Sequence, residues 1–139
     1  MDPQERRSRL TAARVARLAT VSADGEPHVV PVAFVLLDDV VYTAVDGKPK
    51  TTRRLRRLAD VEATGRASVL VDAYDEDWST LWWVRADGAA EVLPSGSPRE
   101  RRAIDALVAK YPQYAAARPA GPVIAVQVGQ WRSWAYTGS

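Results

Sequence analysis

The residues best suited to bind a ligand form a basic cluster between positions 48 and 57. Lys48 and Lys50 are followed by Thr51 and Thr52, either of which can cap a helix. The cluster continues with four arginines and no acidic residue: Arg53, Arg54, Arg56 and Arg57. Like charges three or four positions apart on a helix cost roughly 0.2 to 0.5 kcal/mol per pair, and a bound anion turns each repulsion into an attraction. The cluster therefore predicts a phosphate site at a helix N-terminus.

Two other interpretations of the basic cluster remain open. It could be a solvated helix face, which is the ordinary role of a charged run. It could also be a DNA-binding helix, but 19 Lys and Arg against 17 Asp and Glu leave a net charge of only +2. In addition, no second helix precedes the cluster at helix-turn-helix spacing. Nucleic-acid binding is the least favoured interpretation, and we expect no nucleic-acid partner.

The chain offers few groups for metal or acid–base chemistry. It has no cysteine and a single histidine, His28, so we expect no metal site. A lone histidine at the start of a strand is typical of a structural role, and proton donation to a reduced product is the alternative. The sequence therefore names no catalytic residue.

Five tryptophans could form a wall for a planar ligand, although this residue type more often fills cores and interfaces. They are Trp78, Trp82, Trp83, Trp131 and Trp134. Trp78 is the strongest candidate for ligand contact because it lies beside the acidic loop 75–77.

The elements that must position these residues are strands and short helices. Apolar and β-branched runs predict strands, and Gly, Pro and Asp mark the turns between them. Strands are expected at 15–22, 27–37, 40–44, 67–74, 81–93, 123–128 and 131–136, with a bend at Gly129 between the last two. Helices are expected at 2–14, from 51 or 52 to 58, and at 97–112, with polar or Ala/Pro/Gly-rich connections at 60–66 and 114–122. This pattern predicts one mainly β domain over residues 1–139, an antiparallel barrel of six or seven strands with short peripheral helices.

The strand run 27–37 carries two further predictions. It does not alternate between apolar and polar residues, so both of its faces should be covered by protein or ligand. Pro31 removes one backbone donor, which places the run at a sheet edge, a bulge or a break. Together with the tryptophans, this apolar surface predicts a homodimer. The N-terminus lacks the apolar stretch of a signal peptide and no run reaches membrane-spanning length, so we expect a cytoplasmic protein with no membrane association.

Several segments, in this order, resemble the split β-barrel flavin and deazaflavin oxidoreductases, the pyridoxamine 5'-phosphate oxidase-like superfamily. They are Arg17-Leu18-Ala19-Thr20-Val21 with Asp24-Gly25, His28-Val29-Val30-Pro31-Val32, Gly47-Lys48-Pro49-Lys50, and Asp77-Trp78 with Leu81-Trp82-Trp83-Val84-Arg85 and Gly88. Within this superfamily the chain is most similar to the actinobacterial class thought to use coenzyme F420. The resemblance implies an FMN-binding split-barrel fold and a homodimer with the cofactor at the subunit interface.

The resemblance also implies roles for particular residues. The backbone of Val30, Pro31 and Val32 would lie along the flavin-like ring, and Thr43 and Ala44 would line it. The cofactor phosphate would be held by Lys48 and Lys50, and Thr51 or Thr52 could add a hydroxyl. Trp78 would contact the ligand, and Arg54, one of the surplus arginines, is a further predicted cofactor contact.

The surplus of arginines favours F420 over FMN, because a polyglutamyl tail would use more cations than one phosphate needs. The fuller set of phosphate- and substrate-binding residues of the FMN-using oxidases is missing, which argues against vitamin B6 chemistry. The sequence thus predicts an F420-dependent oxidoreductase acting on a small planar or unsaturated molecule. An FMN flavoprotein, or a non-catalytic carrier of a flavin-like ligand, is the alternative.

Overall fold

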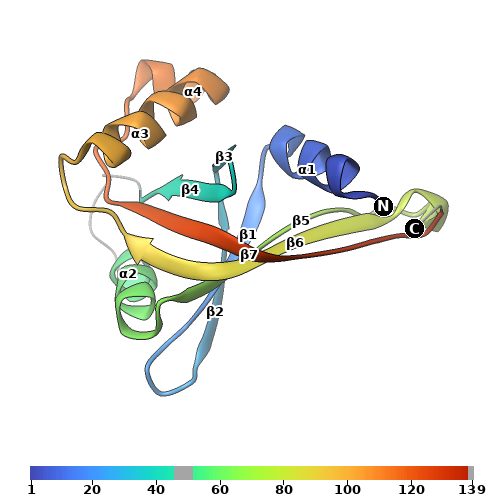
Figure 1. Cartoon of the computed structure of the whole chain (residues 1–139), viewed down its shortest axis with the longest axis horizontal. Helices are drawn as coiled ribbons and strands as arrows, with labels where there is room; N and C mark the ends of the chain where they lie inside the picture. The colour runs from blue at the N-terminus through green and yellow to red at the C-terminus, as the bar shows by residue number, and fades with distance from the viewer. Residues whose placement is uncertain (46–51, 138–139) are drawn as a thin grey trace.

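The fold is one curled antiparallel sheet with helices at its margins (Figure 1). This computed structural model describes residues 1–45 and 52–137, with side chains described for 1–45 and 56–137. The strands are β1 (Ala16–Val21), β2 (Pro27–Val32), β3 (Val35–Leu37), β4 (Val40–Ala44), β5 (Arg66–Ala73), β6 (Trp82–Val92) and β7 (Val123–Ala135). The helices are α1 (Pro3–Ala12), α2 (Thr52–Thr64), α3 (Pro98–Lys110), α4 (Pro112–Ala116) and the 3-10 turn η1 (Trp78–Thr80).

The seven strands of the described chain lie in the order β2-β1-β5-β6-β7-β4-β3, and every neighbouring pair is antiparallel. The predicted mainly β, antiparallel fold with short peripheral helices is therefore confirmed. β2 is an edge strand, as Pro31 predicted. Its outer edge has no neighbouring strand within the described residues.

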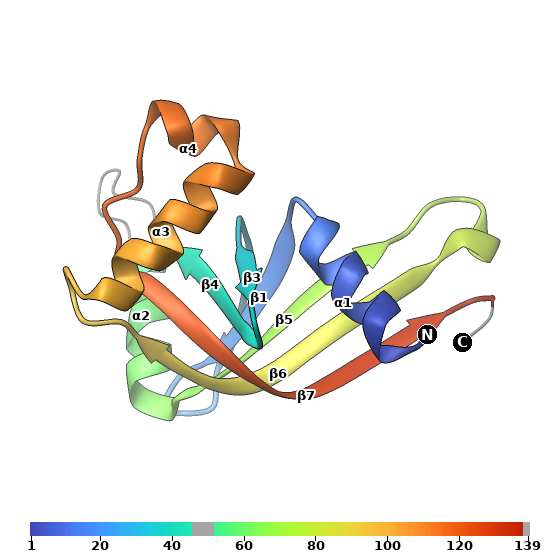
Figure 2. The same cartoon turned by 45° about the horizontal axis from the view of Figure 1, so that its top comes forward.

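The helices cover two different parts of the sheet. α3 and α4 lie together over β3 and β4, whereas α2 packs against β1 and β6 (Figure 2). One apolar cluster fills the inside of the curled sheet around Phe34, Leu18 and Val84. A second cluster lies beneath α3, around Leu107 and Val123. The candidate functional site lies at the α2 side of the molecule.

The predicted strand 27–37 is interrupted, which corrects the expectation of one continuous strand. The Tyr111 hydroxyl accepts a hydrogen bond from the Phe34 amide at 3.1 Å and lies 3.1 Å from the Phe34 carbonyl oxygen. Because these backbone groups bond to a side chain from the end of α3, they leave the sheet ladder, and β2 ends at Val32. The first helix is also shorter than predicted, ending at Ala12.

The helix after the basic cluster is longer than predicted. The polar segment 60–66 was expected to be a connection, but α2 continues through it to Thr64. Gly65 ends the helix with a φ of 65° while its amide bonds to the Val61 carbonyl at 2.8 Å. Asp60, which made the segment look solvent-exposed, is only 2% exposed. The prediction failed because burial of that carboxylate depends on side chains from other elements.

The last two predicted strands form a single strand, β7. The expected break at Gly129 is a β-bulge: Asp87 pairs with Gln130, whereas Gly88 pairs with Val128. Gly129 is the extra residue, so the strand bends without losing its partner β6. The connection predicted at 114–122 begins inside the short helix α4.

Candidate functional site

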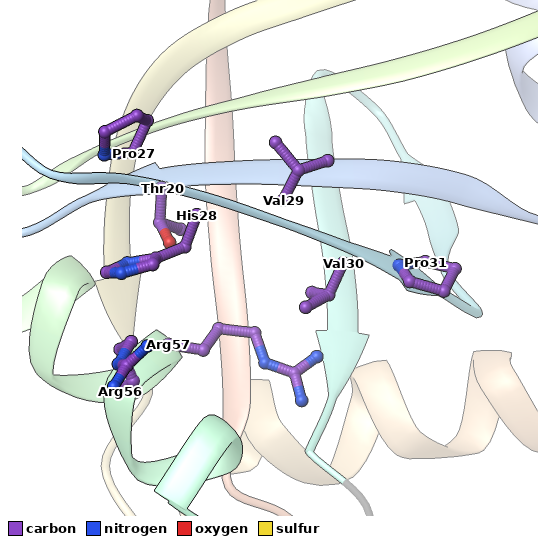
Figure 3. A pocket seen from close by; sticks show the side chains of 8 residues that line it. All are labelled: Thr20, Pro27, His28, Val29, Val30, Pro31, Arg56 and Arg57. Atoms are coloured by element: carbon purple, nitrogen blue, oxygen red, sulfur yellow. The ribbon is translucent and has the colours of Figure 1, made fainter.

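A pocket of about 360 Å³ lies between the edge strand β2 and helix α2 (Figure 3). It is lined by Thr20, Pro27, His28, Val29, Val30, Pro31, Arg56 and Arg57. The side chains of His28 and Val30 extend from β2 toward α2, and the Arg57 side chain crosses the space below Val30 (Figure 3). The pocket thus combines apolar side chains, the free edge of a strand and guanidinium groups.

One buried carboxylate fixes α2 against the sheet beside this pocket. Oδ2 of Asp60, from α2, accepts a hydrogen bond from Oγ1 of Thr20, from β1, at 2.8 Å. The same oxygen lies 2.7 Å from Nδ1 of His28, from β2. Asp60 is 2% exposed and Thr20 is 6% exposed, so these bonds form in a largely dry environment where an unpaired polar group would be costly. This three-residue network, Thr20–His28–Asp60, therefore positions α2 relative to β2.

The electrostatics of the α2 side favour an anion. The first turn of α2 contains no acidic residue. One turn further on, Arg56 is exposed and Arg57 is half-buried at the pocket wall. Partial positive charge at a helix N-terminus adds to these cations and attracts negatively charged groups. A ligand with a phosphate near the start of α2 and a flat ring along β2 would match both walls.

Only some of the residues predicted to lie along a cofactor ring line the pocket. Val30 and Pro31 line the pocket. Val32, Thr43 and Ala44 are buried within the protomer, and Oγ1 of Thr43 donates a 2.7 Å hydrogen bond to the Ala33 carbonyl. Ring contact by these five residues stays a prediction.

The predicted phosphate ligands fall mainly outside the described residues. Lys48, Lys50 and Thr51 lie in the undescribed segment, and Arg54 belongs to the first turn of α2 without a described side chain. The helix begins at Thr52, close to where a threonine cap was predicted. The anion site itself stays a prediction.

Trp78 lies far from this pocket within one protomer. It is 65% exposed in η1, at the end of the β5–β6 hairpin where Ala73 pairs with Trp82. The neighbouring Asp77 carboxylate accepts hydrogen bonds from the Ser79 hydroxyl at 2.6 Å and the Ser79 amide at 3.1 Å, which lower the pKa of Asp77. α2 joins β5 at its opposite end, and the eight residues of β5 span roughly 26 Å. Trp78 therefore does not join the other predicted residues in one chain.

Sequence reasoning missed Asp60 and Thr20 as site residues, whereas Arg57 belongs to the predicted basic cluster. A signal for one pairing was present, because the short turn at 22–26 places Thr20 and His28 opposite each other in the hairpin. The position of Asp60 had no comparable signal, since it required knowing that α2 continues past residue 58 and packs on β1.

A second, more apolar pocket of about 310 Å³ lies on the face of β5 and β6 that points away from the apolar core. It is lined by Leu70, Asp72, Tyr74, Trp83 and Arg85. The guanidinium group of Arg85 lies 6.0 Å from the Trp83 ring centre, and its Nε donates to the Asp87 carboxylate at 2.9 Å. Partial burial acts to raise the pKa of Asp87, but hydrogen bonds from Ser68 and Arg85 lower it overall.

The described residues offer neither a cluster of metal ligands nor a helix that could span a membrane. No group of three or more histidines, cysteines or acidic residues is placed to hold a metal ion. No helix in the described ranges has the length and apolar character needed to cross a bilayer.

Comparisons with known proteins identify relatives in sequence and in structure. Over 94 residues, 67% of this chain, the sequence is 36% identical to a 5a,11a-dehydrotetracycline/5a,11a-dehydrooxytetracycline reductase from Streptomyces rimosus. The match spans 64% of the length of that protein.

Solved structures with the same fold come from several bacteria. A conserved hypothetical protein from Mycobacterium tuberculosis aligns with a TM-score of 0.79 and 20% identity, covering 99% of this chain and 86% of that one. An FAD-binding protein from Mesorhizobium loti aligns with a TM-score of 0.73 and 24% identity, over 96% and 92% of the two chains. The heme storage protein HutZ from Vibrio cholerae gives a TM-score of 0.73 at 14% identity, over 96% and 93%. At these identities the comparisons establish a shared fold.

The sequence model of the pyridoxamine 5'-phosphate oxidase family matches residues 2–135, which include every strand and helix described above. The curled seven-stranded sheet is the FMN-binding split-barrel fold that the sequence motifs predicted. The chain belongs to the pyridoxamine 5'-phosphate oxidase family.

Proposed function

We propose that this protein is an oxidoreductase that uses the deazaflavin coenzyme F420 to transfer a hydride to or from a small planar or unsaturated molecule. The observation that carries the proposal is the pocket between β2 and α2, with one wall a free strand edge and the other a helix bearing guanidinium groups. The similarity to a dehydrotetracycline reductase supports a reductive reaction on an unsaturated substrate.

The described residues fit a flavin-like group. Backbone N–H and C=O groups on the outer edge of β2 suit the polar rim of a flat ring, and Val30 offers it an apolar surface. The bound cofactor would supply or accept the hydride, and the protein would bind it, orient it and exclude water. This division of labour explains how a reductase could work without a catalytic triad.

The arginines of α2 favour F420 over FMN. Charge-assisted hydrogen bonds contribute roughly 1.5 to 3 kcal/mol each, so two or three suffice for one phosphate. Lys48 and Lys50 with the helix start meet that need, which leaves the arginines for a polyglutamyl tail. FMN carries no such tail, and an FMN flavoprotein is the second candidate because the same phosphate site would serve it.

We further propose that two copies of the chain associate, with the cofactor between them. Large apolar side chains are exposed in one protomer: Val29 is 62% exposed, Tyr74 70% and Trp78 65%. The predicted cover over both faces of β2 is not supplied by its own chain, since Val29 is open. A second copy would cover these side chains and would allow Trp78 of one protomer to approach the pocket of the other. A cytoplasmic location remains a prediction.

Turnover separates these candidates. Reduced F420 and reduced FMN would each be mixed with the protein and a cyclic enone, and oxidation of the cofactor followed by absorbance. The proposal predicts enone-dependent oxidation of F420 at a rate at least tenfold above that with FMN. Faster oxidation of FMN would favour the second candidate. Tight binding of either cofactor without turnover of any acceptor would indicate a carrier, a role compatible with the FAD-binding and heme storage proteins that share the fold.

A further inference from the structure

We propose that His28 is the proton donor that completes the reduction, held in position by Asp60. This inference rests on the proposed function. It concerns the Thr20–His28–Asp60 network, in which His28 both bonds to the buried carboxylate and lines the pocket beside β2 (Figure 3).

The hydrogen bonds determine which ring nitrogen is available for chemistry. Oδ2 of Asp60 accepts from the Thr20 hydroxyl at 2.8 Å and lies 2.7 Å from Nδ1 of His28. Since a carboxylate oxygen is an acceptor, Nδ1 carries a hydrogen and donates it. The proton that His28 can exchange is therefore on Nε2.

The surroundings of Nε2 are unusual for a purely structural histidine. Nε2 is buried and has no hydrogen-bond partner among the described residues. A buried polar atom without a hydrogen bond costs about 1 to 3 kcal/mol. A hydrogen bond from Nε2 to a ligand atom in the pocket would remove this cost. The nearest acid to Nε2 is the 73% exposed side chain of Glu26, with Oε1 at 3.4 Å.

The charged groups facing His28 come from two segments. α2 contributes Asp60 and, at the pocket wall, Arg56 and Arg57, while the turn before β2 contributes Glu26. Asp60 stabilises the protonated ring, and the guanidinium groups attract an anionic product of hydride addition. Glu26 reaches solvent and offers a route by which the ring regains its proton.

The proposed step balances in atoms and electrons. The bound deazaflavin would supply a hydride to the β-carbon of a carbon–carbon double bond conjugated to a carbonyl, and the π electrons of that bond would move to give an enolate. The proton on Nε2 of His28 then transfers to the α-carbon, the ring becomes neutral, and water restores its proton. The two electrons that the cofactor would lose travel with the hydride, so the double bond gains one hydride and one proton.

The test uses the fact that His28 is the only histidine of the chain, so its ring gives one set of NMR signals. The pH at which these signals are half-shifted would be measured on the protein without cofactor. Single-turnover reduction of a cyclic enone by reduced F420 would then be followed across the same pH range. The proposal predicts a rate that falls as pH rises, with its midpoint at the pH where the signals are half-shifted. A rate midpoint that differs from the NMR midpoint by more than one pH unit would overturn it.

Two variants extend the test. His28→Gln should reduce the enone roughly 100-fold more slowly in a single turnover at saturating F420, and lose the pH dependence. Asp60→Asn should move the NMR and rate midpoints together, because both would report the same ring after it loses its positioning partner. Asp24→Asn, which removes one exposed acid from the turn before β2, is the matched control and should move neither midpoint.

Failure of this inference differs from failure of the proposed function. An active wild type with an equally fast, equally pH-dependent His28→Gln variant would refute the role of His28 alone. A wild type that transfers no hydride from F420 to any acceptor would refute the proposed function, and the inference with it.

Discussion

A single hydroxyl group ties the break between β2 and β3 to helix α3. The Tyr111 hydroxyl lies 3.1 Å from both backbone polar atoms of Phe34 and 3.0 Å from the Arg14 carbonyl oxygen. We expect Tyr111→Phe to lower the free energy of unfolding by about 1 to 3 kcal/mol, because the buried Phe34 amide loses its acceptor. Urea denaturation followed by tryptophan fluorescence measures this. An unchanged denaturation midpoint would show that another group satisfies the Phe34 amide.

Titration of Lys110 makes the stability of the folded protein depend on pH. Burial, together with the charge of Arg14, lowers the pKa of Lys110 to about 8 from its usual 10.5. Its ammonium group lies 3.9 Å from the centre of the Phe34 ring. Between pH 8 and 10 the unfolded chain holds this proton more tightly than the folded chain, so stability rises with pH in that window.

The Lys110 effect can be isolated by comparison with a variant. Lys110→Met removes the titrating group, so the difference in unfolding free energy between variant and wild type should shrink by about 1 kcal/mol from pH 8 to pH 10, after allowance for solvent screening. Denaturation of both proteins at each pH provides the values. Above pH 10 the raised pKa of Tyr111, caused chiefly by its burial, opposes the trend. A constant difference from pH 8 to 10 would contradict the assignment.

For single residues, the sequence indicated where charged side chains cluster but not which polar side chains are buried. The basic cluster and Pro31 stood out by type alone, and Pro31 lies on an edge strand as expected. Asp60 falls in a predicted polar connection, and its burial was not predicted because its two hydrogen-bond partners come from β1 and β2, 40 and 32 residues earlier in the chain. Contacts over such separations leave no local pattern to detect.

The pairing of β6 with β7, the longest in the sheet, depends on a close approach of the two backbones at the bulge. A Cβ atom added at Gly88 would lie 1.8 Å from the Gln127 carbonyl oxygen, a backbone atom that cannot move aside cheaply. At Gly129, the extra residue of the same bulge, the nearest atom would be 3.9 Å away. The two glycines therefore provide a matched pair.

We expect Gly88→Ala to destabilise the protein by about 3 kcal/mol or more, because either the bulge or the strand pairing must shift. Gly129→Ala should cost less than about 1 kcal/mol, since the added methyl group meets only ordinary van der Waals contacts. Thermal denaturation of the two variants beside wild type compares them directly. Equal losses would mean that the spacing of β6 and β7 does not depend on Gly88.

Prediction of elements succeeded where a local signal existed. Asp2 and Ser97 were expected to begin helices, and their side chains accept from the Glu5 and Glu100 amides at 2.8 and 3.2 Å. The bend at Gly129 was expected between two strands, but a bulge keeps one ladder continuous. The break after Val32 depends on Tyr111 from a distant helix, which explains why it was not predicted.

For the whole molecule, the exposed aromatic side chains predict self-association. Trp134 packs edge-on against Tyr136 at 6.5 Å, and both remain partly open to solvent. We expect a dimer in sedimentation experiments at micromolar concentration. Trp134→Glu should weaken the dimer at least tenfold by placing a charge in an apolar interface. Arg118→Glu, on an exposed surface beyond α4, is the control and should leave it intact. A wild-type monomer at all concentrations would contradict the proposed assembly.

At this scale the fold class was predictable from strand number and turn spacing, and the family from ordered motifs. The set of predicted cofactor contacts was not, because Val30 and Pro31 lie on β2 whereas Trp78 lies beyond β5. Val30 and Pro31 line the pocket, Trp78 lies at the far end of β5, and Lys48 and Lys50 lie in the undescribed segment.

We propose that the basic cluster of residues 48–57 holds a phosphate-bearing deazaflavin. Calorimetric titration of F420 into wild type and the Lys48→Ala/Lys50→Ala double variant tests it most directly, with Arg101→Ala/Arg118→Ala removing the same charge from another exposed surface as control. We predict a loss of affinity of roughly 100-fold or more in the lysine variant, from two lost charge-assisted hydrogen bonds. The control should bind like wild type. Equal F420 affinity in all three proteins, or no F420 binding by wild type, would contradict the account.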